Sequence, residues 1–346
     1  MRAGSPGDRE RFVDALSSAE VDEGPDPLLL IVTGATASGK TALSLPVAER
    51  LSAEIVSADS RQVYRGMDIG TAKPTAAERA RVPHHGLDVV DPDQRYSAGR
   101  FSRDARGWIR GIRDRGRIPL VVGGTGFFLK ALTEPLFAEP ELDEDRRSRL
   151  RAYLRRQPRA RLEAWARWLD PDRADLAAEG GPQRLARTLE VALLTGRPLS
   201  SWHRVAEPEE KALPAVVVVV ELSREEMDLR IEERVSRMVA AGWVGEVEDL
   251  VAAGYGRDAP GMSAVGYREI LAFLEGRSSL DEAAEAIRRN TRRYARRQLT
   301  WFRNQLPRDT VRVDALAPME RQIRTVVEAW NGRRVAERMT NEEAGQ

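Results

Sequence analysis

The sequence predicts an α/β fold, in which a parallel β-sheet core carries helices on both faces and an α-helical domain is inserted. Two observations lead to this prediction. Short runs of Val, Ile and Leu alternate with long helical patterns, which is typical of a parallel sheet that is buried on both sides. One long stretch, residues 140–213, contains no strand-like run and is rich in Arg, Glu, Leu and Trp.

The apolar runs predict five buried strands, at residues 28–33, 54–58, 87–90, 118–122 and 215–221. After the fifth run, Ser223 and Glu226 form a capping box, and apolar residues at helical spacing predict a helix to about residue 240. The remainder is expected to be helical to about residue 330.

These elements predict a core at residues 27–139 and 214–330 and a helical insertion at residues 140–213. Within the insertion, helical patterns cover residues 146–156, 159–169 and 183–194, the last of which begins after Pro182 and ends before Gly196. Residues 1–26 are polar and are expected to be a disordered extension, and residues 331–346 are expected to be a polar tail.

Composition excludes several classes of protein. The 346 residues include 55 Lys and Arg against 54 Asp and Glu, and the longest apolar run, residues 215–220, stops at Glu221, so no membrane span is expected. The chain has no cysteine, which rules out disulfides, thiolate nucleophiles and cysteine-ligated zinc, and suits a cytoplasmic protein. We also expect a monomer.

A phosphate-binding loop follows the first predicted strand and precedes a helical pattern. The segment fits the pattern G-x-x-x-x-G-K-[ST], and its residues are Gly34, Ala35, Thr36, Ala37, Ser38, Gly39, Lys40 and Thr41. Backbone N–H groups and the Lys40 ammonium would hold phosphates, and the Thr41 hydroxyl would bind Mg²⁺. A chance match in a chain of this length has a probability of about 1%. The core is therefore expected to resemble P-loop NTPases, with a site for a diphosphate or triphosphate.

Two further elements follow predicted strands and are expected at the same sheet edge. Asp59 comes directly after the second strand, where a parallel sheet collects ligands, although a helix cap is an alternative role. Gly123, Gly124 and Gly126 surround Thr125 after the fourth strand, as a close approach to a ligand or a plain turn would require.

Residues 288–303 contain no acid, although they include six arginines that share one half of a helical wheel: Arg288, Arg289, Arg292, Arg293, Arg296 and Arg297. Like charges at this spacing repel, so an anionic partner is favoured over a solvated face. His84 and His85 are adjacent, which is a poor arrangement for one metal ion. Trp165 and Trp168 are expected to pack in the insertion, with base stacking as the alternative.

Five segments together resemble the tRNA dimethylallyltransferases, also called tRNA isopentenyltransferases. They are residues 34–41, 59–74, 123–130, 182–187 and 291–303, and the resemblance covers about residues 28–304. It implies transfer of a dimethylallyl group from dimethylallyl diphosphate to N6 of the adenosine directly 3′ of the anticodon (position 37), in tRNAs that read codons beginning with U.

The resemblance also implies roles for residues. Asp59 would accept the amine proton, Thr125 would orient it, and Lys40, Arg234 and Mg²⁺ on Thr41 would neutralise the diphosphate. The implied contacts to tRNA, which has its target base flipped out and its anticodon stem-loop clamped by the insertion, are Asp59, Ser60, Arg61, Gln62, Thr125, Arg147, Gln183, Arg184, Leu185, Ala186 and Arg187.

The sequence departs from the family at Phe127 and Phe128, where Leu-Tyr is usual, and at Ser263, where Gln is usual. Three rival functions remain open at this point. They are prenyl transfer to free AMP, ADP or ATP, phosphoryl transfer by a small-molecule kinase, and tRNA binding without catalysis. The insertion favours tRNA over a free nucleotide, and the Lys40, Thr41 and Asp59 set favours catalysis.

Overall fold

The computed structural model describes residues 28–137, 140, 142–205 and 208–344. The described residues divide into two compact units, a core unit within residues 28–133 and 213–344 and a helical unit within residues 134–212. The extension expected at residues 1–26 lies outside the described residues. No helix among the described residues is both long and apolar enough to cross a membrane.

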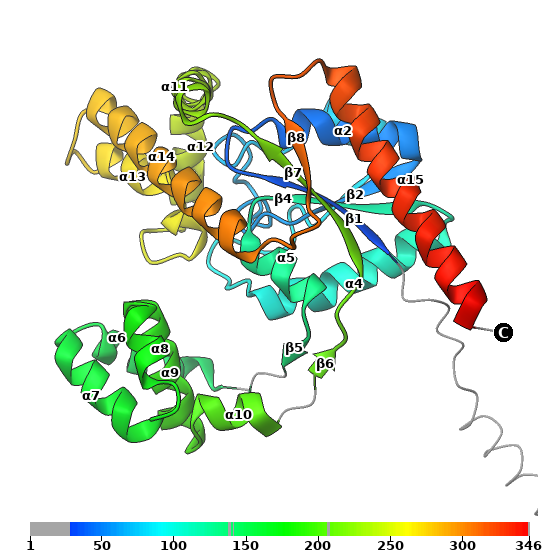
Figure 1. The fold of residues 1–346 in the computed structure, drawn as a ribbon. Helices are drawn as coiled ribbons and strands as arrows, with labels where there is room; N and C mark the ends of the chain where they lie inside the picture. The colour runs from blue at the N-terminus through cyan, green and yellow to red at the C-terminus, as the bar shows by residue number, and fades with distance from the viewer. Residues whose placement is uncertain (1–27, 138–139, 141, 206–207, 345–346) are drawn as a thin grey trace, which may run out of the picture. The chain divides into compact units, whose positions relative to one another are not determined.

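A six-stranded sheet lies in the described part of the core unit, and all of its strands are parallel, as expected for an α/β fold (Figure 1). The strand order is β3-β2-β4-β1-β7-β8. The strands are β1 (Leu29–Gly34), β2 (Ala53–Ser57), β3 (His84–His85), β4 (Ile118–Gly123), β7 (Ala215–Glu221) and β8 (Val311–Asp314).

Side chains alternate between the two faces of the sheet, and each face has its own core. Leu29 and Ile31 pack on one face, whereas Leu30 and Val32 pack on the other. The second face is covered by α2 (Lys40–Leu51) and α15 (Met319–Ala344). The first is covered by α4 (Ala98–Asp114), α5 (Gly126–Thr133), α11 (Arg224–Ala240), α12 (Trp243–Ala252), α13 (Tyr267–Leu274) and α14 (Leu280–Gln305) (Figure 1). Two shorter elements, α3 (Ala76–Arg81) and the 3₁₀-helix η1 (Gly261–Ser263), lie in the connections.

The third predicted strand was wrong in position. Residues 87–90 form a loop in which Asp88 has a φ of +55°, and the N–H groups of Val89 and Val90 both donate to the Val63 carbonyl. The sheet is instead extended by β3 at His84–His85, which pairs with β2. The apolar run predicted a strand because Val90 is buried and forms an isolated β-bridge with Tyr64, but the run does not pair with the sheet.

The C-terminal region was also misjudged. Strand β8 was missed, because only Val313 of its four residues is buried at this sheet edge and the apolar signal is correspondingly weak. The expected polar tail at residues 331–346 is the continuation of α15, which runs to Ala344. Good helix formers prolong this helix beyond Trp330, its last buried apolar residue.

Four of the five described helices of the helical unit contribute to a small core that contains Leu154, Leu162, Leu185 and Leu189. The described helices are α6 (Glu144–Leu154), α7 (Arg159–Leu169), α8 (Ala174–Glu179), α9 (Pro182–Thr195) and α10 (Leu199–Val205). Two short antiparallel strands, β5 (Leu136–Phe137) and β6 (Pro208–Glu210), pair where the chain enters and leaves the unit.

Candidate active site

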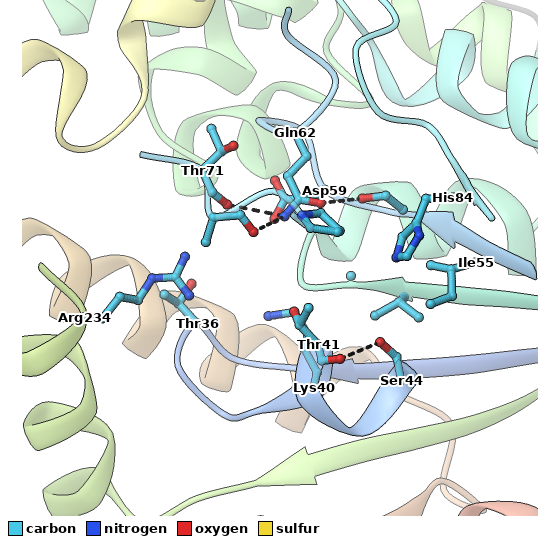
Figure 2. Close-up of a pocket in the computed structure, with 15 residues that line it drawn as sticks. Thr36, Lys40, Thr41, Ser44, Ile55, Asp59, Gln62, Thr71, His84 and Arg234 are labelled. Carbon is cyan, nitrogen blue, oxygen red and sulfur yellow. Dashed lines mark hydrogen bonds between the residues drawn. The ribbon is translucent and has the colours of Figure 1, made fainter. Parts of the chain in front are cut away.

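The loops after β1 and β2, together with the last residues of β4, line one cavity of about 60 Å³ at the carboxyl ends of these strands. Figure 2 shows Lys40 and Thr41 on one side of this cavity and Asp59 and Gln62 on the other, with Arg234 reaching in from α11. The structure therefore brings together the phosphate loop, the predicted base and the predicted arginine.

The phosphate loop has the backbone shape that anion binding requires. Ala37 and Gly39 have φ angles of +68° and +93°, and α2 begins at Lys40. The Ser38 N–H donates to the Ala35 carbonyl. The N–H groups of Ala37, Gly39, Lys40 and Thr41, by contrast, have no hydrogen-bond partner among the described residues. Such donors at a helix N-terminus are the usual ligands of a phosphate.

Three charged side chains influence one another in this cavity. Burial lowers the pKa of Lys40 to about 8, with the charge of Asp59 acting in the opposite direction and that of Arg234 in the same one. Burial likewise lowers the pKa of Arg234, and Asp59 partly offsets the effect. Lys40 and Arg234 are half-buried, and these two cations outnumber the carboxylate of Asp59, so the cavity has a net positive charge that favours an anionic ligand.

Asp59 is held by its own loop. Its Oδ1 accepts a hydrogen bond of 2.8 Å from the Arg61 N–H, as in an Asx turn, which leaves Oδ2 for a ligand. The Thr125 hydroxyl accepts a bond of 3.0 Å from the Ser60 N–H. Thr125 thus fixes the residue next to Asp59 and makes no direct bond to its carboxylate. Gly123 permits this approach, because a Cβ there would lie 2.1 Å from the Ala58 carbonyl oxygen.

A second cavity of about 220 Å³ adjoins the first and shares four lining residues with it, Thr36, Asp59, Thr71 and Arg234. Its other walls come from helices of the C-terminal half, and sequence reasoning assigned no site role to the lining residues Met238, Trp243, Arg268, Thr291 and Tyr294. The pKa of Tyr294 is raised to about 12, chiefly by burial and then by the charge of Asp59. The signal that could have identified Tyr294 was its place in the 291–303 segment.

Gln62, a predicted nucleotide contact, is held by residues of its own loop and of the end of β2. Its Oε1 accepts from the Ser57 hydroxyl at 2.8 Å, and its Nε2 donates to the carbonyls of Thr71 and Ala72 at 3.3 and 3.1 Å. Both amide hydrogens are therefore used inside the loop. Gln62 lines the cavity as part of its frame.

Ser263 and Phe128, two of the three departures from the family pattern, have partners in the structure. The Ser263 hydroxyl accepts from Nη1 of Arg61 at 3.1 Å and donates to the Pro260 carbonyl at 2.6 Å, so it anchors a cavity-lining arginine. Phe128 is buried and stacks on Phe101 with ring centroids 4.2 Å apart, whereas Phe127 is exposed.

The arginine run of α14 is partly neutralised, which corrects the expectation that all six side chains face an anionic partner. Acidic residues of α11 supply counter-charges: Arg288 and Arg292 each bind Glu232, at 2.8 and 2.7 Å, and Arg296 lies 3.6 Å from Asp228. These acidic residues belong to another helix, so the sequence of residues 288–303 alone does not reveal them. Arg297 lines the second cavity and lies 5.8 Å from the Tyr294 ring centroid.

In the helical unit, Gln183 and Arg184 are exposed at the start of α9. Burial lowers the pKa of Arg173, the charge of Asp170 opposes this effect, and the charges of Arg184 and Arg187 add to it. Three guanidinium groups therefore lie near one carboxylate. The Leu185 side chain, in contrast, is fully buried in the core of the unit, and Ala186 packs against it. Leu185 therefore supports α9 and does not present its side chain to a ligand.

Arg147, another predicted tRNA contact, is engaged within its unit. Its Nε lies 3.1 Å from Oε2 of Glu190, whose side chain is 2% exposed and also binds Arg151. This pairing neutralises a buried carboxylate. Trp165 packs in the helical unit as expected and stacks on Tyr153. The same expectation was wrong for Trp168, which is 80% exposed.

The two histidines serve the sheet edge. Nδ1 of His84 lies 2.7 Å from the Val82 carbonyl, and Nε2 of His85 lies 2.7 Å from Glu54, which also binds Arg115. Across the described residues, no group of three His, Asp or Glu side chains is placed to hold a metal ion.

Comparisons with known proteins agree with this geometry. The family model "IPP transferase" matches residues 62–305, and the model "Isopentenyl transferase" matches residues 27–84. The tRNA dimethylallyltransferase of Geobacter metallireducens is 47% identical over 80% of this chain and 89% of its own length, and that of Sorangium cellulosum is 46% identical over 80% and 88%. The crystal structure of the full-length tRNA isopentenylpyrophosphate transferase from Bacillus halodurans, 35% identical, matches with a TM-score of 0.66 over 91% of this chain and 99% of its own.

Proposed function

The chain belongs to the IPP transferase family and prenylates tRNA, and from that premise we propose the following reaction. The enzyme transfers a dimethylallyl group from dimethylallyl diphosphate to N6 of the adenosine directly 3′ of the anticodon, in tRNAs that read codons beginning with U. The observation that carries the proposal is one cavity in which a phosphate loop with Lys40 and Arg234 faces the carboxylate of Asp59.

In this reaction the bond between C1 of the prenyl group and the diphosphate oxygen breaks, and a bond from C1 to N6 forms. The electron pair leaves with the diphosphate, whose charge rises in the transition state. The free N–H groups of Ala37 and Gly39, with Lys40 and Arg234, are fixed donors for this charge, and such preorganised donors are a major source of catalysis.

Asp59 accepts the proton that N6 loses. Its Oδ1 is held by the Arg61 N–H, so its remaining oxygen is available to the amine. Asp59 lies in the wall shared by both cavities, which places the base between the diphosphate side and the larger, partly apolar side. The larger cavity is the proposed place of the prenyl chain and the extruded adenine, with Trp243 and Tyr294 in its walls.

Mg²⁺ is the proposed cofactor. A magnesium ion prefers oxygen ligands and usually keeps several waters, so the Thr41 hydroxyl, diphosphate oxygens and water form a suitable set without a carboxylate cluster. Thr41 lines the cavity beside Lys40, which fits this set (Figure 2). The ion would supply further neutralisation of the leaving group.

The helical unit is the proposed contact for the anticodon stem-loop. Arg173, Arg184 and Arg187 outnumber the nearby carboxylate of Asp170, so they offer net positive charge for phosphates, and Gln183 is exposed at the start of the same helix. We further propose that the enzyme acts in the cytoplasm, where its tRNA substrate is found.

The test incubates the protein with Mg²⁺ and labelled dimethylallyl diphosphate, together with undermodified tRNA or with AMP, and follows label into N6 of adenosine. Label in tRNA alone is expected. Label in AMP alone would identify a free-nucleotide enzyme. ATP consumption on a small acceptor without prenyl transfer would identify a kinase and contradict the role of Asp59.

A further inference from the structure

Gln298 is a buried glutamine of α14 that reaches two loops of the site. Its side chain is 7% exposed. Its Oε1 accepts hydrogen bonds from both the N–H and the hydroxyl of Thr36, at 2.9 and 3.0 Å. Its Nε2 donates to the carbonyl of Gly124 at 2.8 Å. One amide thus links the phosphate loop to the turn after β4, from a position 262 residues away from Thr36.

The surroundings of Gln298 show that its polar group serves these loops. The other fully buried positions of α14 are apolar: Ala283, Ile287, Ala295 and Phe302. A buried amide is costly unless it is hydrogen-bonded, and the only bonds of this amide are to Thr36 and Gly124 within the described structure. The turn after β4 leaves room for this amide only because residue 124 is glycine, since a Cβ there would lie 2.5 Å from Nε2 of Gln298.

The bonds also determine which donors of the phosphate loop are free. The Thr36 N–H points to Gln298 and is not available to a ligand, whereas the N–H groups of Ala37 and Gly39 have no partner among the described residues. On the other side, Gly124 precedes Thr125, which holds Ser60 next to Asp59. Gln298 therefore connects the loop that would bind the diphosphate to the loop that carries the base.

We propose that Gln298 is a positioning residue, which fixes the phosphate loop against the turn after β4 in the conformation that receives the diphosphate. The proposal deepens the proposed function and rests on it. In this role Gln298 contacts neither the prenyl donor nor the tRNA, and it acts through its hydrogen bonds to Thr36 and Gly124.

The test measures the affinity for inorganic diphosphate with Mg²⁺ and, separately, the affinity for tRNA. Gln298→Met keeps the length of the side chain and removes all three bonds, so the dissociation constant for diphosphate is expected to rise about tenfold, while that for tRNA changes less than twofold. Gln322→Met is the matched control: Gln322 is a 6% exposed glutamine on the other face of the sheet, and its Nε2 donates to the Ala317 carbonyl at 2.7 Å. The control is expected to keep both affinities.

Two further variants make the result specific. Gln298→Glu keeps an acceptor for Thr36 but turns an oxygen toward the Gly124 carbonyl, so diphosphate binding should weaken even where Gln298→Met unfolds. Thr36→Val removes the hydroxyl bond, and its effect should be smaller in the Gln298→Met background than in the wild type. The diphosphate-binding assay contains no tRNA and involves no prenyl transfer. Weaker diphosphate binding by the Gln298 variants therefore supports the proposal whether or not the protein prenylates tRNA.

Unchanged diphosphate affinity in folded Gln298→Met would overturn the proposal. An equal loss of affinity in Gln322→Met would also overturn it, since the effect would then come from general destabilisation. Failure of the wild type to prenylate tRNA, with diphosphate binding intact, would contradict the proposed function alone.

Discussion

The phosphate loop, residues 34–41, and the loop after β2, residues 58–75, face the same cavity but differ in how their polar groups are used. The phosphate loop leaves the N–H groups of Ala37 and Gly39 without a partner among the described residues. In the loop after β2, Lys73 is 1% exposed and binds Asp68 and Asp88, each at 2.6 Å. The first loop is built to receive a ligand, and the second is built to stay in place.

A helix outside the second loop supports it. Oε2 of Glu246 in α12 accepts from the N–H groups of Asp68 and Ile69 at 2.7 and 2.6 Å, and its Oε1 accepts from Gly70 at 3.1 Å. We call the phosphate loop the donor side of the site and the loop after β2 its base side. The difference between them shows that the donor side supplies groups that bind the diphosphate, whereas the base side supplies a rigid frame for Asp59. Each prediction below tests one side of this difference.

The largest expected effect follows replacement of the base. Asp59→Asn keeps an oxygen for the Arg61 N–H and so preserves the loop, but it cannot accept the amine proton, and kcat is expected to fall about 10³-fold. Diphosphate affinity should hold or rise, because a negative charge near Lys40 and Arg234 is lost. Single-turnover rates and separate binding measurements check this.

The control for Asp59 is Asp93→Asn, which changes an exposed carboxylate with no side-chain partner in the described structure. It should leave kcat unchanged. A fall in tRNA affinity that matches the fall in kcat for Asp59→Asn would show a binding role in place of proton transfer.

Much of the donor side could be predicted from sequence, because the phosphate loop is a local pattern whose geometry follows from its own residues. Gly34 to Thr41 come together in eight consecutive positions, directly after a buried strand. Asp59 and Thr125 were placed at the same edge because parallel strands end there together.

The frame of the base side could not be predicted, because its bonds join residues far apart in sequence. Glu246 accepts hydrogen bonds from the backbone of residues 68–70, although it lies 178 positions after Asp68 in the sequence, and no local sequence pattern predicts that contact. The same limit explains the arginine run of α14, whose counter-charges Asp228 and Glu232 lie on α11. Periodicity indicates which face of a helix is polar, but not which helix packs against it.

The donor side should respond to pH through Lys40. This group is charged below its pKa of about 8, so diphosphate affinity is expected to be nearly constant to about pH 7 and to weaken by about tenfold per pH unit above pH 8. The dissociation constant of inorganic diphosphate, measured from about pH 6 to about pH 10 on either side of this pKa, tests the expectation.

Lys40→Met supplies the reference for that profile, because any remaining pH dependence then comes from the titration of diphosphate itself. The variant should bind diphosphate more weakly than the wild type at pH 7 and lack the wild-type decline. An identical profile in both proteins would show that Lys40 does not contact the ligand.

A smaller effect is expected when the frame is loosened without touching the base. Glu246→Gln replaces an acceptor oxygen with an NH₂ group that faces backbone donors, so hydrogen exchange at residues 68–70 should quicken and kcat should fall about tenfold. Glu248→Gln, on the exposed side of the same helix, is the matched control. Faster exchange with unchanged kcat would mean that rigidity of this loop is not needed for catalysis.

The smallest effect is expected in the helical unit, because one surface arginine supplies only part of an RNA contact. The Arg184 side chain lies over Gly180, where a Cβ would come within 2.3 Å of its Cδ, and its charge lies near those of Arg173 and Arg187. Arg184→Ala should weaken tRNA binding a few-fold and reduce the slope of log affinity against log salt by about 0.7, the value for one phosphate contact on a single strand. Diphosphate affinity should not change, since the phosphate loop belongs to the core unit.

The control for Arg184 is Arg321→Ala, which removes an exposed arginine of α15 and should leave the salt slope as it is. An unchanged slope in Arg184→Ala would remove this arginine from the RNA-binding surface and leave the donor side as the better-supported half of the site.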